Sequence, residues 1–439
     1  MSEESRLYSV GLYTLGCKVS QYETEAIGEA FERRGFTVGR YEDENDVYLI
    51  NTCTVTAESD RKSRQMIRRA IKKNPDAVVI VVGCYSQRSP GEVAKIEGVS
   101  AVLGSADKLS AVDIAISLLA NREAKTVVSV SNIDEADFEP MCITRAPRTR
   151  AYVKIEDGCE CRCSYCAIPS ARGRVRSKAR EDVISEVEWL YASGVREIVL
   201  TGIETASYGK DFDEPYSLAD LIVELDCRKS CERLRLGSLA PELINEEFIN
   251  KVKKTEILAP HFHLSMQSGS DTTLRRMRRR YNTAMAERNI ALIREAFPTA
   301  HFTTDMMVGF PGESEADFLE TVDFVRRIGF LDTHVFAYSR RERTPAADFD
   351  SQIDEAVKRE RSERLIRVKC EVRDKILDNI VKQGEPARVI LENYRGGAYS
   401  AHSDNFVEYS VKAEEGLTGE MRKVRPVSRK GGVIYAEII

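Results

Sequence analysis

The sequence has no long hydrophobic run, no excess of basic residues and little histidine, and each shortage excludes a class of protein. Apolar runs such as "AVVIVVG" (77–83) have the length of a strand and fall short of the roughly 20 residues of a membrane span, so no membrane partner is predicted. The N-terminus "MSEESRLYSV" is polar and acidic and lacks the apolar stretch of a signal peptide, which predicts a cytoplasmic protein. The formal net charge of −5 argues against attraction of nucleic acid over the whole surface.

Basic residues are nevertheless concentrated in three runs, at 61–73, 170–180 and 275–280. Lysine and arginine runs of this kind are typical of segments that follow the phosphates of a nucleic acid. The alternative is that each run is a solvated helix face. Binding of nucleic-acid phosphates by these runs is one hypothesis, and solvated helix faces are the other.

The 439 residues exceed what one hydrophobic core usually organises, and the patterns predict four segments. Residues 1–126 alternate short apolar runs with helical patterns, which predicts a doubly wound parallel α/β domain. Residues 127–142 lose the pattern and are predicted to be a linker. Six further strand-helix units in 143–374 predict a curved parallel sheet, a partial barrel of TIM type. Residues 375–439 combine short strands with Gly turns, which predicts a small all-β module.

The central segment contains "GCECRCSYC", with four cysteines close together. Cys159, Cys163 and Cys166 form C-x3-C-x2-C directly after a predicted strand. In a reducing compartment, clustered cysteines indicate metal or redox chemistry rather than disulfides. Three thiolates would hold a 4Fe-4S cluster and leave one iron open to a small molecule. Cys161 occupies a spacer position.

Zinc is the alternative for this loop, with Cys161 as a fourth ligand. Structural zinc sites use four closed ligands, typically in two separated C-x2-C pairs, and these cysteines are not spaced in that way. None of the five histidines lies at zinc-finger spacing from the loop, so none is a candidate for a further zinc ligand. Iron–sulfur is the favoured interpretation.

A second set of cysteines ends three successive strands of the first domain. Cys17 closes "YTLGC", Cys53 closes "YLINTC" and Cys84 closes "VIVVGC". Neighbouring strands lie about 4.8 Å apart, and the carboxyl ends of parallel strands meet at the edge where such sheets bind ligands. Three buried cysteines acting as small hydrophobic residues are the alternative. The repeated position favours a second iron–sulfur cluster.

The loop C-x3-C-x-Tyr-C, at the end of the first strand of a six-unit barrel, resembles the radical S-adenosylmethionine superfamily. The resemblance implies that the open iron binds S-adenosylmethionine and that an electron from the cluster cleaves it to a 5′-deoxyadenosyl radical. Small residues at later strand ends would let the cofactor approach the backbone. The residues expected to bind it are Tyr165, Thr201, Gly202, Ile203, Ser238 and Gln267.

The three-part arrangement resembles the methylthiotransferase family. The motifs that carry the resemblance are "TLGCKVSQYE" (14–23), "NTCTVT" (51–56), "GCYSQ" (83–87), "DGCECRCSYCAIPSARG" (157–173), "LTGIETASYGKD" (200–211), "QSGSD" (267–271) and "VGFPGES" (308–314). It implies that the second cluster carries or donates sulfur, that one S-adenosylmethionine methylates it, and that another supplies the radical. The last module is similar to the TRAM domain, an RNA-binding unit.

The first motif resembles the branch that acts on N6-threonylcarbamoyladenosine at position 37 of tRNA and adds a methylthio group to carbon 2. The alternatives are the branches acting on another tRNA adenosine or on a ribosomal protein. The implied partners are the anticodon stem-loop, with the base splayed into the barrel mouth, an electron donor such as a flavodoxin or ferredoxin, and a sulfur source. Three residues depart from the family pattern and bear on the substrate: Ser20 where Asn is expected, Glu204 where His or Asn is frequent, and Arg343 where Gly is usual.

Overall fold

The computed structural model describes residues 7–121, 125–146 and 149–439. The first six residues of the polar N-terminus lie outside this range, as do two residues at the start of the predicted central segment. Contacts divide the chain into two compact units. The first comprises 1–143, 156–178 and 339–344, and the second comprises 144–155, 179–338 and 345–439. The four boundaries expected from sequence patterns stay predictions.

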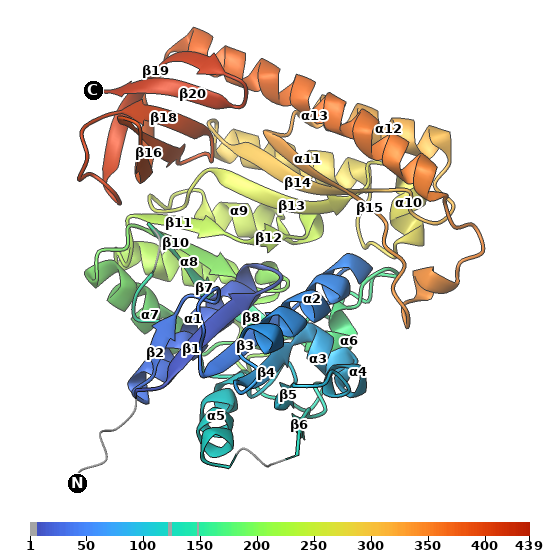
Figure 1. The fold of residues 1–439 in the computed structure, drawn as a ribbon. Helices are drawn as coiled ribbons and strands as arrows, with labels where there is room; N and C mark the ends of the chain where they lie inside the picture. The colour runs from blue at the N-terminus through green and yellow to red at the C-terminus, as the bar shows by residue number, and fades with distance from the viewer. Residues whose placement is uncertain (1–6, 122–124, 147–148) are drawn as a thin grey trace. The chain divides into compact units, whose positions relative to one another are not determined.

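The first unit is built on a six-stranded parallel sheet with the order β2-β1-β3-β4-β5-β6 (Figure 1). Strands β3 and β4 are buried along their whole length, as expected for continuous apolar strands at the centre of a sheet covered on both faces. The strands are β1 (Ser9–Thr14), β2 (Thr37–Gly39), β3 (Val47–Thr52), β4 (Val78–Gly83), β5 (Ala101–Leu103) and β6 (Val127–Ser129). The helices are α1 (Lys18–Arg33), α2 (Ala57–Lys73), α3 (Cys84–Arg88), α4 (Pro90–Ala94) and α5 (Ala111–Ala120).

The first unit also holds the segment with the C-x3-C-x2-C loop. This segment contains a short antiparallel pair, β8 (Glu156–Asp157) with β9 (Arg176–Ser177), and helix α6 (Ile168–Arg172). Helix α6 packs against α3, which starts directly after β4. The two cysteine sets therefore share one compact unit.

The second unit holds all six strands expected for the central barrel, in two parallel sheets with the orders β11-β10-β7 and β12-β13-β14-β15 (Figure 1). Gly237 separates β11 from β12. A Cβ at Gly237 would lie 2.9 Å from Thr205 Oγ1, so the close approach there requires glycine. The strands are β7 (Arg150–Lys154), β10 (Glu197–Thr201), β11 (Arg233–Leu236), β12 (Ser238–Leu239), β13 (His261–Gln267), β14 (His301–Val308) and β15 (Asp332–Ala337).

Helices alternate with these strands, as the pattern predicted. They are α7 (Arg180–Ala192), α8 (Leu218–Cys227), α9 (Glu246–Val252), α10 (Asp271–Arg276), α11 (Thr283–Ala296) and α12 (Glu315–Ile328). Two of them, α8 and α12, begin with full capping boxes at Ser217 and Ser314.

A long helix, α13 (Glu355–Gln383), leads to a closed β-barrel with the order β16-β17-β18-β20-β19. Its strands are β16 (Ala387–Arg395), β17 (Ala398–Ser403), β18 (Glu408–Lys412), β19 (Met421–Lys430) and β20 (Val433–Ile438). The predicted fold class, an α/β domain followed by a parallel α/β core and a small all-β module, is confirmed. Within the described residues, no helix combines the length and apolarity needed to cross a membrane.

Candidate functional site

The base of the C-x3-C-x2-C loop is fixed by a glycine. Gly158 has φ +87°, and a Cβ there would lie 1.8 Å from the carbonyl oxygen of Arg174. The amide of Cys159 donates a hydrogen bond of 3.0 Å to the carbonyl of Gly173. No other residue would allow this close approach of the two ends of the loop.

Backbone amides point at two of the loop sulfurs. The Cys161 amide donates to Cys159 Sγ and the Ile168 amide donates to Cys166 Sγ, each at 3.5 Å. Cys163 is buried. Hydrogen bonds to thiolate sulfurs are one means by which a protein sets the potential of an iron–sulfur cluster. The loop therefore offers three thiols and two sulfur-directed donors.

Cys161 lies against Cys159, and the next residue, Arg162, has a left-handed backbone with φ +47°. Hydrogen bonding to Cys161, followed by burial, raises the pKa of Cys159 far above its usual value. Within residues 7–121, 125–146 and 149–439, no three His, Cys, Asp or Glu side chains are arranged to hold a single metal ion. The choice between zinc and an iron–sulfur cluster therefore stays a prediction. Three thiols are the donor set that an iron–sulfur cluster takes, with each thiolate on a separate iron, and each thiol must lose its proton to bind.

The structure brings the strand-end cysteines together at the edge of the first sheet. Strands β1, β3 and β4 are adjacent; Cys53 and Cys84 directly follow β3 and β4, and Cys17 lies three residues after the end of β1. A Cβ built on Gly16 would lie 3.2 Å from Cys53 Cβ. Burial, then the neighbouring Cys84 and more weakly Cys17, raises the pKa of Cys53 to about 11. The thiol set fits a second cluster, and its role as ligand stays a prediction.

A buried ionic network lies beside both cysteine sets. Arg172 is fully buried, and its guanidinium forms two bonds with Glu23, at 2.5 and 3.2 Å, and one of 3.1 Å with Asp157. Lys108 Nζ lies 3.1 Å from Glu23 Oε1. Glu23 and Asp157 belong to two of the cysteine motifs, 14–23 and 157–173. These arginine and lysine partners were missed by the sequence reasoning.

The interpretation of run 170–180 as a phosphate-binding segment is wrong for most of its cations. Arg172, Arg176 and Lys178 are at most 3% exposed, so they cannot reach a nucleic acid. Arg176 and Lys178 instead donate to the carbonyls of Ile133 and Met141, at 3.2 and 2.8 Å. These three cations therefore form ion pairs and hydrogen bonds inside the first unit.

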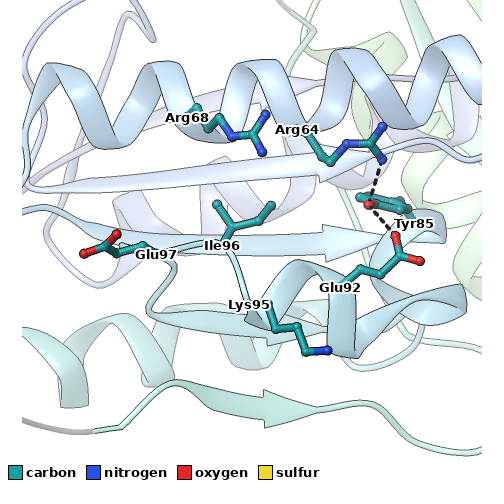
Figure 2. Close-up of a pocket in the computed structure, with 7 residues that line it drawn as sticks. All are labelled: Arg64, Arg68, Tyr85, Glu92, Lys95, Ile96 and Glu97. Carbon is teal, nitrogen blue, oxygen red and sulfur yellow. Dashed lines mark hydrogen bonds between the residues drawn. The ribbon is translucent and has the colours of Figure 1, made fainter.

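Part of run 61–73 also faces the protein. A pocket of about 620 Å³ lies between helix α2 and the segment after α3. Figure 2 shows its lining residues, with Tyr85 at one end. Arg64 donates a hydrogen bond to Tyr85 Oη, which donates to Glu92 Oε2, each at 3.0 Å. These two hydrogen bonds hold the side chain of Tyr85, the residue that follows Cys84. Most other cations of the run are exposed along α2: Arg61, Lys62, Arg68, Arg69, Lys72 and Lys73.

The predicted cofactor-binding residues fall in both units. Tyr165 lies in the loop of the first unit. In the second unit, Thr201 ends β10 and Gln267 ends β13, so these two residues lie at carboxyl ends of parallel strands, where sites of such barrels gather. Ser238 begins β12, two residues after the carboxyl end of β11. Gly202 and Ile203 directly follow Thr201. Gln267 has φ +67°, a strained backbone conformation that is frequent at functional sites.

The three departures from the family pattern have structural consequences. Ser20 Oγ lies 3.8 Å from Cys17 Sγ. Glu204 is buried and accepts a hydrogen bond of 3.1 Å from the amide of Ala240, so its carboxylate supports the backbone beside β12. Arg343 has φ +60°, a conformation that favours glycine and explains why Gly is usual there.

Comparisons with known proteins agree with this geometry. Residues 153–325 match the family model described as "Radical SAM superfamily", and residues 9–104 match "Uncharacterized protein family UPF0004". A Bacillus subtilis protein named threonylcarbamoyladenosine tRNA methylthiotransferase MtaB is 40% identical over 98% of this chain and 95% of its own length. A Thermotoga maritima protein of the same name is 36% identical over 95% and 94%.

A Natranaerobius thermophilus protein named tRNA-2-methylthio-N(6)-dimethylallyladenosine synthase is 32% identical over 98% of both chains. Among solved structures, the radical S-adenosylmethionine methyltransferase TsrM from Kitasatospora setae, with cobalamin and a 4Fe-4S cluster bound, has a TM-score of 0.58. It covers 78% of this chain and 74% of its own at 18% identity, which supports a shared fold only.

Proposed function

The chain belongs to the radical S-adenosylmethionine methylthiotransferase family, as its motifs predicted, and we propose that it adds a methylthio group to carbon 2 of N6-threonylcarbamoyladenosine at position 37 of tRNA. The observation that carries the proposal is the 40% identity, over nearly the whole chain, to a protein named for that substrate. The relative named for the dimethylallyl substrate is less similar, at 32% identity.

We assign the loop thiols Cys159, Cys163 and Cys166 to a 4Fe-4S cluster. With S-adenosylmethionine bound, such a cluster would supply the radical chemistry needed at the target carbon. The amides of Cys161 and Ile168 hold two of the sulfurs, and Gly158 keeps the ends of the loop together. Tyr165 of the first unit, and separately Thr201, Gly202, Ile203, Ser238 and Gln267 of the second unit, stay the proposed cofactor-binding residues.

We assign a second 4Fe-4S cluster to Cys17, Cys53 and Cys84, where it would take part in sulfur delivery. The adjacency of β1, β3 and β4 supports this assignment, because it brings three thiols to one sheet edge. Cys17 is exposed and Cys84 is buried, so solvent reaches the set at Cys17. A sulfur source and an electron donor such as a flavodoxin or ferredoxin would complete the reaction.

The tRNA would be held through its phosphates by exposed cations and by the C-terminal barrel. Two of the three basic runs have mostly exposed cations and could contact phosphates: the outer face of α2 and the run at 275–280. In the second of these, the exposed residues are Arg275, Arg276, Arg278 and Arg280. The barrel of β16–β20 has the closed all-β architecture expected of a TRAM-like module. These surfaces would position the anticodon stem-loop and leave base recognition to the radical site.

The test is expression in a host that lacks this tRNA modification, followed by mass spectrometry of tRNA nucleosides. We expect the methylthio derivative of N6-threonylcarbamoyladenosine with the natural sequence and its absence with Cys163→Ala. A methylthio derivative of a different adenosine would redirect the proposal to another tRNA substrate. Unchanged tRNA, with a methylthio group on a ribosomal protein, would overturn it.

A further inference from the structure

Arg172 joins the two cysteine sets through a sulfur contact. It ends helix α6, and its Nε lies 3.1 Å from the Sγ of Cys84, the first residue of α3. Both side chains are buried, and Arg172 is 0% exposed. A cationic donor fully removed from water thus points at one member of the strand-end cysteine set.

The carboxylates fix the direction of this donor. Both terminal nitrogens of Arg172 bind Glu23, and Nη1 also lies 3.1 Å from Asp157 Oδ2. Because guanidinium is planar, these bonds fix the plane of the group and direct Nε to Cys84. Lysine has one donor centre and cannot bridge the carboxylates while also donating sideways to the sulfur.

The network contains other cations, but their contacts differ. Lys108 reaches Glu23 and Arg176 lies 3.7 Å from Asp157 Oδ2. Within the part of the chain that the structure describes, neither cation has a hydrogen bond to a cysteine. Each carboxylate therefore keeps a second cation if Arg172 is replaced, which favours survival of the fold. The sulfur contact is specific to Arg172.

We propose that Arg172 is a positioning residue for the second cluster: its Nε holds the Cys84 sulfur and raises the reduction potential of the cluster bound there. A hydrogen bond to a ligating sulfur stabilises the state with more negative charge, which is the reduced state. In a buried site this effect is stronger than in water. The inference rests on the proposed assignment of a cluster to Cys17, Cys53 and Cys84.

The test uses the full chain with Cys159→Ala, Cys163→Ala and Cys166→Ala, so that only the second cluster can be assembled. After anaerobic reconstitution, iron and sulfide are quantified and the potential is measured by a titration followed by electron paramagnetic resonance. With Arg172→Lys added, we expect the reduction equilibrium constant to fall about tenfold, which is about 59 mV for one electron. With Arg176→Lys added instead, we expect no change, since Arg176 shares Asp157 but not the sulfur.

A second measurement does not depend on an arginine variant folding. In the same triple-alanine chain, labelling of all arginines with ¹⁵N should give a nitrogen hyperfine coupling in pulsed spectra of the reduced cluster. Absence of that coupling, or an unchanged potential in a folded Arg172→Lys chain, would overturn the inference. Absence of iron and sulfide from the triple-alanine chain would instead overturn the second cluster itself, so the two failures are distinguishable.

Discussion

Arg233 Nη1 donates a hydrogen bond of 2.8 Å to Glu197 Oε2, and both side chains are fully buried in the second unit. Arg233 also donates to the carbonyls of His402 and Arg388, at 3.2 and 3.3 Å, so the pair connects β10 and β11 with the C-terminal barrel. Burial alone would raise the pKa of Glu197, but the adjacent arginines, led by Arg235, hold it far below its usual value. The charged carboxylate of Glu197 therefore stabilises the arginine that joins the C-terminal barrel to the parallel sheet.

We expect Glu197→Gln to lower the free energy of unfolding by about 3 to 5 kcal/mol, because it removes the counter-charge of buried Arg235, whereas Arg233 keeps its ion pair with Asp404. Urea unfolding measures this change. The matched control is Glu188→Gln, which alters an exposed carboxylate 3.8 Å from Arg228 and should cost less than about 1 kcal/mol. Equal costs for the two substitutions would mean that the buried carboxylate does not stabilise the fold.

Much of this architecture could be predicted because it follows local patterns. Cys53 and Cys84 could be placed at one sheet edge since apolar runs of strand length precede them. The pairing of Arg172 with Glu23 could not be predicted, because Glu23 is 149 positions away along the sequence. No local sequence pattern distinguishes a buried arginine from one that binds phosphate. The contact of Cys161 with Cys159 was missed for a different reason, since cysteine spacing alone does not show that the Cys161 amide turns toward the Cys159 sulfur.

The left-handed backbone of Arg343 gives a prediction about stability. With φ +60°, an L side chain costs about 1 to 2 kcal/mol, and the Arg343 Nη1 bond of 3.1 Å to the Arg88 carbonyl offsets part of this. Arg343→Gly should therefore change the free energy of unfolding by less than about 0.5 kcal/mol. Arg340→Gly, at a position without positive φ, should lose about 0.4 to 1 kcal/mol through the more flexible unfolded chain. The reverse order would show that the Arg343 contact outweighs the strain.

His301 predicts loss of stability in mild acid. Burial, and then the charge of Arg294, lowers its pKa from 6.5 to about 4. Between these values the unfolded chain takes up a proton that the folded chain refuses, so this contribution is full above pH 6.5 and is lost as the pH falls toward 4. The loss should reach about 3 kcal/mol. Urea unfolding at several pH values should show a flatter profile for His301→Gln, whereas His334→Gln, at a side chain 75% exposed, should keep the slope of the parent.

The exposed run at 275–280 predicts salt-dependent binding of tRNA. Replacing Arg275, Arg278 and Arg280 by Glu should weaken affinity at least tenfold and make the dependence of log K on log salt shallower by about 2, because phosphate contacts release counterions. Fluorescence anisotropy with labelled tRNA at several salt concentrations measures both quantities. The control is Lys253→Glu with Lys254→Glu, which reverses exposed charges on the same unit. If the run and the control behaved alike, the run would not belong to the tRNA surface.

Cys161 separates the iron–sulfur interpretation of the loop from a four-thiolate zinc site. The bond from residue 161 to Cys159 Sγ is donated by its backbone amide, so Cys161→Ser keeps the donor and removes only the surplus thiol. Iron content and cleavage of S-adenosylmethionine should therefore stay within about twofold of the parent after anaerobic reconstitution, since neighbouring sulfurs that are not ligands only modulate a cluster. Cys163→Ser removes a proposed ligand from a buried position and should abolish both. Loss of iron in Cys161→Ser to the extent seen in Cys163→Ser would make Cys161 a ligand and restore the four-thiolate alternative.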